Sequence, residues 1–144
     1  MGGVKRRVRE FIREVYSSFV LAPWAAQIAI VEFDGNAKML THLTSRVEEL
    51  EAAMRVYQTS GMTSISDGLR MALKELSPHL SLGSFPGHGS APFGHNRRPD
   101  ALPVVWMITD GRQTVDGGTP AALAAAAAIK SEGIPLFTWG FGSV

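Results

Sequence analysis

The 144-residue sequence contains no cysteine, which excludes disulfide bonds, thiolate metal sites and a cysteine nucleophile. No apolar run approaches the ~20 residues that a membrane-spanning helix requires. Neither sign of charge dominates, since 14 Lys and Arg residues are balanced by 13 Asp and Glu, for a formal net charge of +1. We therefore expect no membrane span and no nucleic-acid partner.

The amino terminus lacks the features of a targeting signal. Residues 1–20 are basic at the start but contain no continuous apolar core, so they make a poor secretory signal. Glu10 and Glu14 argue against a mitochondrial presequence, which is poor in acidic residues. The compartment stays open: extracellular or cell-surface if the chain is part of a longer secreted protein, and cytoplasmic otherwise.

Composition and apolar spacing predict one domain of alternating helices and strands. Hydrophobic residues make up 45% of the chain and charged residues 19%, as in globular proteins. Apolar steps of three and four predict helices, and runs rich in β-branched residues predict strands. The predicted helices span 4–20, 45–57 (N-cap Ser45), 65–76 and 119–133 (N-cap Thr119); the predicted strands span 26–33, 37–43, 102–109 and 134–142, the last two buried and the first two forming a hairpin.

The order of these elements favours an α/β domain with a mostly parallel sheet covered on both faces. Ligands of such sheets bind beyond the carboxyl ends of the strands. Asp110 follows the strand at 102–109, and Thr63 precedes the helix at 65–76, so both positions fit one rim. Asp110 could instead cap a turn, and Thr63 could cap the following helix.

Residues 77–101 are dense in Gly, Pro, Ser and His, which is typical of a surface loop inserted between a helix and a strand. The spacing of His79, His88 and His95 fits no compact metal-ligand pattern. We therefore treat 77–101 as an insertion within a single domain that spans 1–144.

Four segments, taken in order, resemble the von Willebrand factor type A domain, the fold also found in integrin I domains. The segment "GMT" at 61–63, with the helix after it, is similar to that family's "GGT…AL" segment. The run "VVWMITDGR" at 104–112 resembles its strand ending in Thr-Asp-Gly. The hairpin "IAIVEFDGNAKML" at 28–40 and the strand "IPLFTWGFG" at 134–142 look like two further elements of the family.

The resemblance implies a Rossmann-like three-layer α/β/α fold with a mostly parallel sheet and one antiparallel edge hairpin. It also implies a Mg²⁺ or Mn²⁺ site for adhesion at the carboxyl edge, built by three loops. Thr63 would supply a hydroxyl oxygen and Asp110 a carboxylate, directly or through water; a carboxylate of a protein ligand commonly completes the coordination. Mg²⁺ prefers six oxygen ligands at about 2.0–2.1 Å.

The sequence also departs from the family pattern. Met62 replaces a glycine, and Ile65 replaces a hydroxyl residue. The chain opens "MGGVKRRVREF", just after the place where the family's first ligand motif, Asp-x-Ser-x-Ser, would end. We therefore expect a domain truncated at both ends, without the central first strand or the last strand and helices, because the chain is an internal piece or a gene model begun at an internal methionine.

The leading prediction is a binding module, not an enzyme. It would mediate metal-assisted protein recognition in adhesion, matrix or complex assembly, with an incomplete metal site in this chain and hence weak or absent metal binding. The alternatives are a fragment of a nucleotide-dependent α/β enzyme and an inert structural remnant. Against an enzyme, no phosphate-binding loop follows a strand, and no nucleophile lies beside a base.

Overall fold

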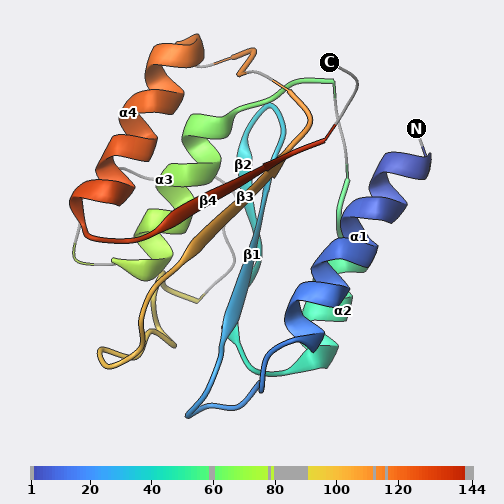
Figure 1. Ribbon diagram of the computed structural model, residues 1–144, viewed down its shortest axis with the longest axis vertical. Coiled ribbons are helices and arrows are strands. Elements are labelled where there is room, and N and C mark those ends of the chain that lie inside the picture. The colour runs from blue at the N-terminus through green and yellow to red at the C-terminus, as the bar shows by residue number, and fades with distance from the viewer. Residues whose placement is uncertain are drawn as a thin grey trace.

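A computed structural model describes residues 2–58, 61–77, 79, 91–111, 113–115 and 117–141. Within these residues helices and strands alternate much as the apolar spacing predicts (Figure 1). No helix of the described ranges is both long and apolar enough to cross a membrane. The elements are α1 (Gly2–Ser17), β1 (Ile28–Phe33), β2 (Ala37–Thr44), α2 (Val47–Val56), α3 (Ile65–Leu76), β3 (Val105–Thr109), α4 (Gly118–Ser131) and β4 (Leu136–Gly140).

The described strands form two separate two-stranded sheets. β1 pairs antiparallel with β2, from Ile28 opposite Thr44 to Phe33 opposite Ala37, which confirms the predicted hairpin. β3 pairs parallel with β4, from Val105 opposite Leu136 onward. Helices α1 and α2 lie on one side of the strands, and α3 and α4 on the other (Figure 1). The α/β class and its three layers are confirmed, but β1 and β3 do not join the two sheets into one.

Each pair of helices packs on its own apolar cluster. On one side Tyr16 of α1, Ile30 of β1 and Leu50 of α2 are buried together. On the other side α3 and α4 bury Leu73 and Ile129 beside β3. Gly68 allows α3 to lie close to β1, because a Cβ at this position would meet the Phe33 ring at 2.8 Å.

The two predicted N-caps are wrong. α2 begins after Arg46 rather than Ser45, and Thr44 accepts a hydrogen bond from the Arg46 N–H through its hydroxyl (3.0 Å). α4 has Gly117 as its N-cap instead of Thr119. Gly117 takes a left-handed φ of +85°, which costs glycine little, so the chain turns into the helix earlier than a threonine cap would allow.

The strands β3 and β4 are less buried than their apolar sequences predict. Trp106 is 48% exposed, Phe137 58% and Trp139 59%. The rings of Trp106 and Phe137 contact each other, and both tryptophans contact Phe11 of α1, whose ring centroid lies 4.9 Å from that of Trp139. The prediction of full burial is wrong because α3 and α4 cover the other face of these strands, whereas α1 reaches this face mainly through one aromatic side chain.

The described part of the 77–101 segment is bonded to the body of the protein. Asn96 donates through Nδ2 to the Leu43 carbonyl (2.7 Å), and Arg97 donates through Nε to the Leu76 carbonyl (3.0 Å). His79 Nε2 lies 3.7 Å from a carboxylate oxygen of Glu132. His88 lies outside the described residues. The assignment of 77–101 as an insertion stays a prediction.

Candidate functional site

Three loops meet at the carboxyl ends of β1 and β3. Ser64, in the loop before α3, donates its N–H to the carbonyl of Asp34, which directly follows β1 (2.6 Å). Thr63 donates its N–H to the Thr114 hydroxyl (2.9 Å), and Thr114 returns its own N–H to the Thr63 carbonyl (3.0 Å). These bonds hold the loop before α3 against both neighbouring loops, so the predicted common rim is present.

A second set of hydrogen bonds, made by Gln113, joins the same loops and was not predicted from the sequence. Gln113 is buried; its Oε1 accepts the Ser66 N–H (2.8 Å), and its Nε2 donates to the Ser66 hydroxyl (2.9 Å) and the Val115 carbonyl (2.8 Å). Ser66 is fully buried in the first turn of α3. The only signal in the sequence is a polar residue soon after the Thr-Asp-Gly turn, and such residues are common in exposed loops.

Thr63 and Asp110 line the same cavity, which has a volume of about 240 Å³. Within the described ranges, no hydrogen bond or ion pair engages the Asp110 carboxylate, and none engages the Thr63 hydroxyl. The capping alternative for Thr63 is wrong, and the turn-capping alternative for Asp110 stays a prediction. Ser64 is the N-cap residue of α3, and the Thr109 hydroxyl accepts the Gly111 N–H at the turn after β3 (3.3 Å).

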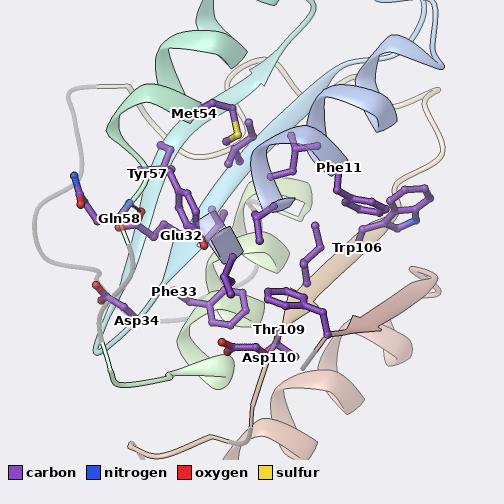
Figure 2. Close-up of a pocket in the computed structure, with 18 of the residues that line it drawn as sticks. Phe11, Glu32, Phe33, Asp34, Met54, Tyr57, Gln58, Trp106, Thr109 and Asp110 are labelled. Carbon is purple, nitrogen blue, oxygen red and sulfur yellow. Dashed lines mark hydrogen bonds between the residues drawn. The ribbon is translucent and has the colours of Figure 1, made fainter. Parts of the chain in front are cut away.

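The cavity is also lined by the carboxylate of Glu32, which was not predicted from the sequence. Glu32 is 5% exposed; its Oε2 accepts the Gln58 N–H (2.6 Å), and its Oε1 lies 3.5 Å from Lys38 Nζ. The signal for it was present, since Glu32 is a single charged residue within an apolar strand. Figure 2 shows Glu32 and Tyr57 on one side of the cavity and Trp106, Thr109 and Asp110 on the other.

The charges around the cavity shift the pKa of Tyr57, which lines it. Burial raises the pKa of the Tyr57 hydroxyl, and the negative charges of Glu32 and Asp110 raise it further, while Arg9 opposes them. The tyrosine therefore stays a neutral hydrogen-bond donor near the two carboxylates. The wall at this end of the cavity is acidic, whereas the rest of the lining is mainly apolar.

The chemistry of the rim suits a hard divalent cation only in part. The Thr63 hydroxyl and the Asp110 carboxylate are oxygen donors of the kind that Mg²⁺ and Mn²⁺ prefer. However, no cluster of three or more His, Asp or Glu side chains able to hold a metal is present in the part of the chain that the structure describes. Two fixed oxygens leave most of an octahedral shell to water or to a ligand.

Comparisons with known proteins agree with the fold. A family model for the von Willebrand factor type A domain matches residues 2–144. Human matrilin-1 is 26% identical over 141 residues, which cover 96% of this chain and 25% of matrilin-1. Human collagen alpha-1(XX) is 26% identical, over 94% of this chain and 9% of that protein. A UPF0353 protein of Mycolicibacterium paratuberculosis is 30% identical, over 83% of this chain and 33% of that protein.

Two solved structures with the same fold are named as metal-loaded. Manganese-loaded TRAP protein of Plasmodium vivax aligns with a TM-score of 0.70 at 19% identity, over 94% of this chain and 49% of that one. Proximal thread matrix protein 1 of the mussel byssus, with zinc in its MIDAS motif, aligns with a TM-score of 0.69 at 21% identity, over 96% of this chain and 33% of that one. The chain thus spans about a third or less of the curated relatives and half or less of these solved chains.

Proposed function

We propose that this chain, which belongs to the von Willebrand factor type A family, acts as a protein-binding module in adhesion or matrix assembly rather than as an enzyme. One observation carries this proposal. Thr63 and Asp110 come from two loops that are hydrogen-bonded together, and both present uncommitted oxygen atoms to one cavity. Matrilin-1 and a collagen chain among the relatives support a role in extracellular assembly.

The rim would take part in binding a divalent cation, Mg²⁺ or Mn²⁺. Thr63 would hold it through the hydroxyl and Asp110 through the carboxylate, directly or through a bound water. When bound, such a cation supplies positive charge that attracts a carboxylate of the protein ligand. Because this chain offers few fixed oxygens, the site is incomplete and the cation alone binds weakly.

The proposal extends to the setting of the module, and the relatives named above support its extracellular part. We propose that residues 1–144 form one partial domain, with 77–101 as its insertion. Its place is extracellular or at the cell surface when it is part of a longer secreted protein. The metals named for the two solved structures support a divalent cation and leave the choice between Mg²⁺ and Mn²⁺ to experiment.

The test is isothermal titration of Mn²⁺ and Mg²⁺ into the chain, with and without an excess of a short glutamate-containing peptide. Binding of the cation and of the carboxylate is reciprocal, so the peptide is expected to raise the Mn²⁺ affinity by about tenfold. Asp110→Asn and Thr63→Val each remove one ligand atom without changing the shape of the side chain much, and should abolish that gain.

A matched control removes a carboxylate elsewhere. Asp100 is exposed and does not line the cavity, so Asp100→Asn should behave as the parent chain does. Equal Mn²⁺ binding by the parent and by Asp110→Asn would contradict the proposed site. Thermal stabilisation of the chain by a nucleotide would instead favour the enzyme alternative.

A further inference from the structure

Two histidines that are far apart in the sequence lie side by side in the structure. His42 is on β2, and His95 is in the segment that precedes β3. Their ring centroids are 5.0 Å apart, and the ring planes are inclined at 77°. The side chain of His42 is 16% exposed and His95 is exposed, so solvent reaches the pair from one side. Neither histidine lines the cavity that contains Thr63 and Asp110.

Each of the two rings has its Nδ1 atom held by an acceptor. His42 Nδ1 lies 2.9 Å from Glu75 Oε2, and His95 Nδ1 lies 3.0 Å from the Pro92 carbonyl oxygen. A carbonyl oxygen has no hydrogen to give, and both oxygens of Glu75 already accept a backbone N–H. Nδ1 is therefore the donor in both rings, and in the neutral imidazole Nε2 then carries a lone pair.

The arrangement of each ring is that of a metal-binding histidine. A histidine that binds a metal through one nitrogen almost always donates its other N–H to a carboxylate or a backbone carbonyl, which fixes the tautomer and the orientation of the ring. Glu75 does this for His42, and the Pro92 carbonyl does it for His95. Among the described residues, no hydrogen bond or ion pair engages Nε2 of either ring, so both atoms are available to a cation.

The distance between the two rings suits one shared zinc ion. Zn²⁺ binds imidazole nitrogen at about 2.0–2.1 Å and prefers tetrahedral coordination, which places the centroids of two bound imidazoles about 5 Å apart. The observed separation of 5.0 Å matches this spacing. No three His, Asp or Glu side chains of the described ranges are placed to hold an ion together, so the two histidines are the only ligands that these ranges offer here.

We propose that His42 and His95 bind one Zn²⁺ ion through their Nε2 atoms, with water at the remaining positions. Glu75 is a positioning residue, because it holds the His42 ring and does not touch the ion. This site differs from the rim in its chemistry, since imidazole nitrogen suits Zn²⁺ whereas hydroxyl and carboxylate oxygens suit Mg²⁺ and Mn²⁺. The proposal goes beyond the metal-assisted function at the rim and does not depend on it.

The bound ion would link β2 to the segment that precedes β3. Near the histidine pair, this segment is attached by two hydrogen bonds, from the Gly94 N–H to Glu75 Oε2 (3.0 Å) and from Asn96 Nδ2 to the Leu43 carbonyl (2.7 Å). An opening that separates the two rings releases the ion, so zinc stabilises the attached state by mass action. Zinc would therefore control how firmly this segment is held on the body of the protein.

The experiment adds ZnCl₂ to the isotope-labelled chain and follows the ring nitrogens of its histidines by NMR. Zinc is expected to shift the Nε2 signals of His42 and His95 together, while their Nδ1 atoms stay protonated. Free Zn²⁺ at ten times its dissociation constant should also slow hydrogen exchange of the Gly94 amide about tenfold. The same concentration of Mg²⁺ should change neither the ring signals nor the exchange, because Mg²⁺ prefers oxygen ligands.

Four variants locate the ion, and zinc titration calorimetry compares them after circular dichroism has shown that each is folded. His42→Asn and His95→Asn each remove Nε2 but keep an N–H donor near the position of Nδ1, so each should weaken zinc binding at least tenfold. His79 lies near Glu132 instead, so His79→Asn is the matched control and should bind zinc as the parent does. Asp110→Asn should also leave zinc binding unchanged.

Several results would overturn the proposal. One is the absence of zinc binding by the parent chain at millimolar Zn²⁺, and another is equal binding by the parent and by His95→Asn. Loss of zinc binding in Asp110→Asn but not in His42→Asn would place the ion at the rim instead. The rim is tested with Mn²⁺ and Mg²⁺ and with different variants, so failure of one proposal leaves the other standing.

Discussion

Helices α3 and α1 both carry a stripe of apolar side chains at helical spacing, but the two stripes have different surroundings. In α3, Ile65, Leu69 and Leu73 pack in the cluster shared with α4 and β3, and Leu73 is 1% exposed. In α1, Val4 is 39% exposed, and Phe11 and Val15 line a cavity. The spacing of apolar residues thus predicts which face of a helix is apolar, but not whether a partner covers it.

Truncation of a packed side chain in α3 should give the largest effect. Leu73→Ala leaves a void in a close-packed cluster and is expected to lower the free energy of unfolding by about 3 kcal/mol. Val15→Ala in α1 only enlarges an existing cavity, so it should cost less than about 1 kcal/mol. Urea unfolding at one temperature measures both. If Leu73→Ala prevents folding, Ile129→Val provides a milder change, with an expected cost of about 1 kcal/mol. Equal losses of unfolding free energy for Leu73→Ala and Val15→Ala would contradict the claim that α1 is less well packed than α3.

The second largest loss of stability is expected when the buried carboxylate of Glu75, at the end of α3, is replaced. Glu75 is 1% exposed and accepts N–H bonds from Leu43 (2.9 Å) and Gly94 (3.0 Å), and His42 Nδ1 lies 2.9 Å from it. Glu75→Gln keeps the shape but replaces a charged acceptor, so it should cost about 2 kcal/mol. The matched change Glu48→Gln, on the exposed side of α2, should be close to neutral in the same urea titration.

The attachment of α1 to α2 should depend on pH. Glu51 of α2 accepts two bonds from Arg13 (2.9 and 2.7 Å) and one from Tyr16. The hydrogen bonds from Arg13, and then that from Tyr16, lower the pKa of Glu51 to about 2. Because the folded-state pKa is below the unfolded value of 4.5, the contribution of Glu51 is complete above pH 4.5 and is lost as the pH falls toward 2.

Unfolding free energies measured from pH 5 to pH 2.5 check this dependence. The parent chain should lose more stability over that range than Glu51→Gln, which lacks the titrating group. The other carboxylates are common to both proteins and cancel in the difference. Parallel pH profiles for the two proteins would show that this contact contributes nothing to the folded state.

The smallest effect is expected at Asp110. Unlike Glu75, its carboxylate is exposed and has no partner within the described residues, so Asp110→Asn should change the free energy of unfolding by less than about 0.5 kcal/mol. The same urea titration used for Glu75→Gln measures it. A large loss of stability would mean that Asp110 is a structural residue rather than a ligand residue.

Local patterns predicted much of the fold. The helix at 65–76 matches α3, and the Asp-Gly turn correctly joined β1 and β2. Burial of β3 was not predictable, because a run of apolar residues in a strand is the same whether or not a neighbouring strand and a helix cover it. The gap between β1 and β3 depends on which strands are side by side, and that is a long-range property.

For the site, the sequence placed Thr63 and Asp110 on one rim but left their capping roles open. The structure rules out the N-cap role of Thr63, because Ser64 occupies that position, whereas the turn-capping role of Asp110 stays a prediction. The structural role of Gln113 could not be predicted, because it depends on a hydrogen bond to Ser66, which lies 47 residues away in the sequence. Contacts of this kind follow from the packing of loops and have no local signature.

One measurement tests the proposed site most directly: broadening of backbone amide signals by Mn²⁺ in the isotope-labelled chain, which detects even weak binding. We predict that the signals of Thr63, Asp110 and Gly111 broaden first, while those near Glu51 and Glu75 persist, and that Asp110→Asn removes the effect. Broadening centred on any other carboxylate, or unchanged by Asp110→Asn, would contradict the account.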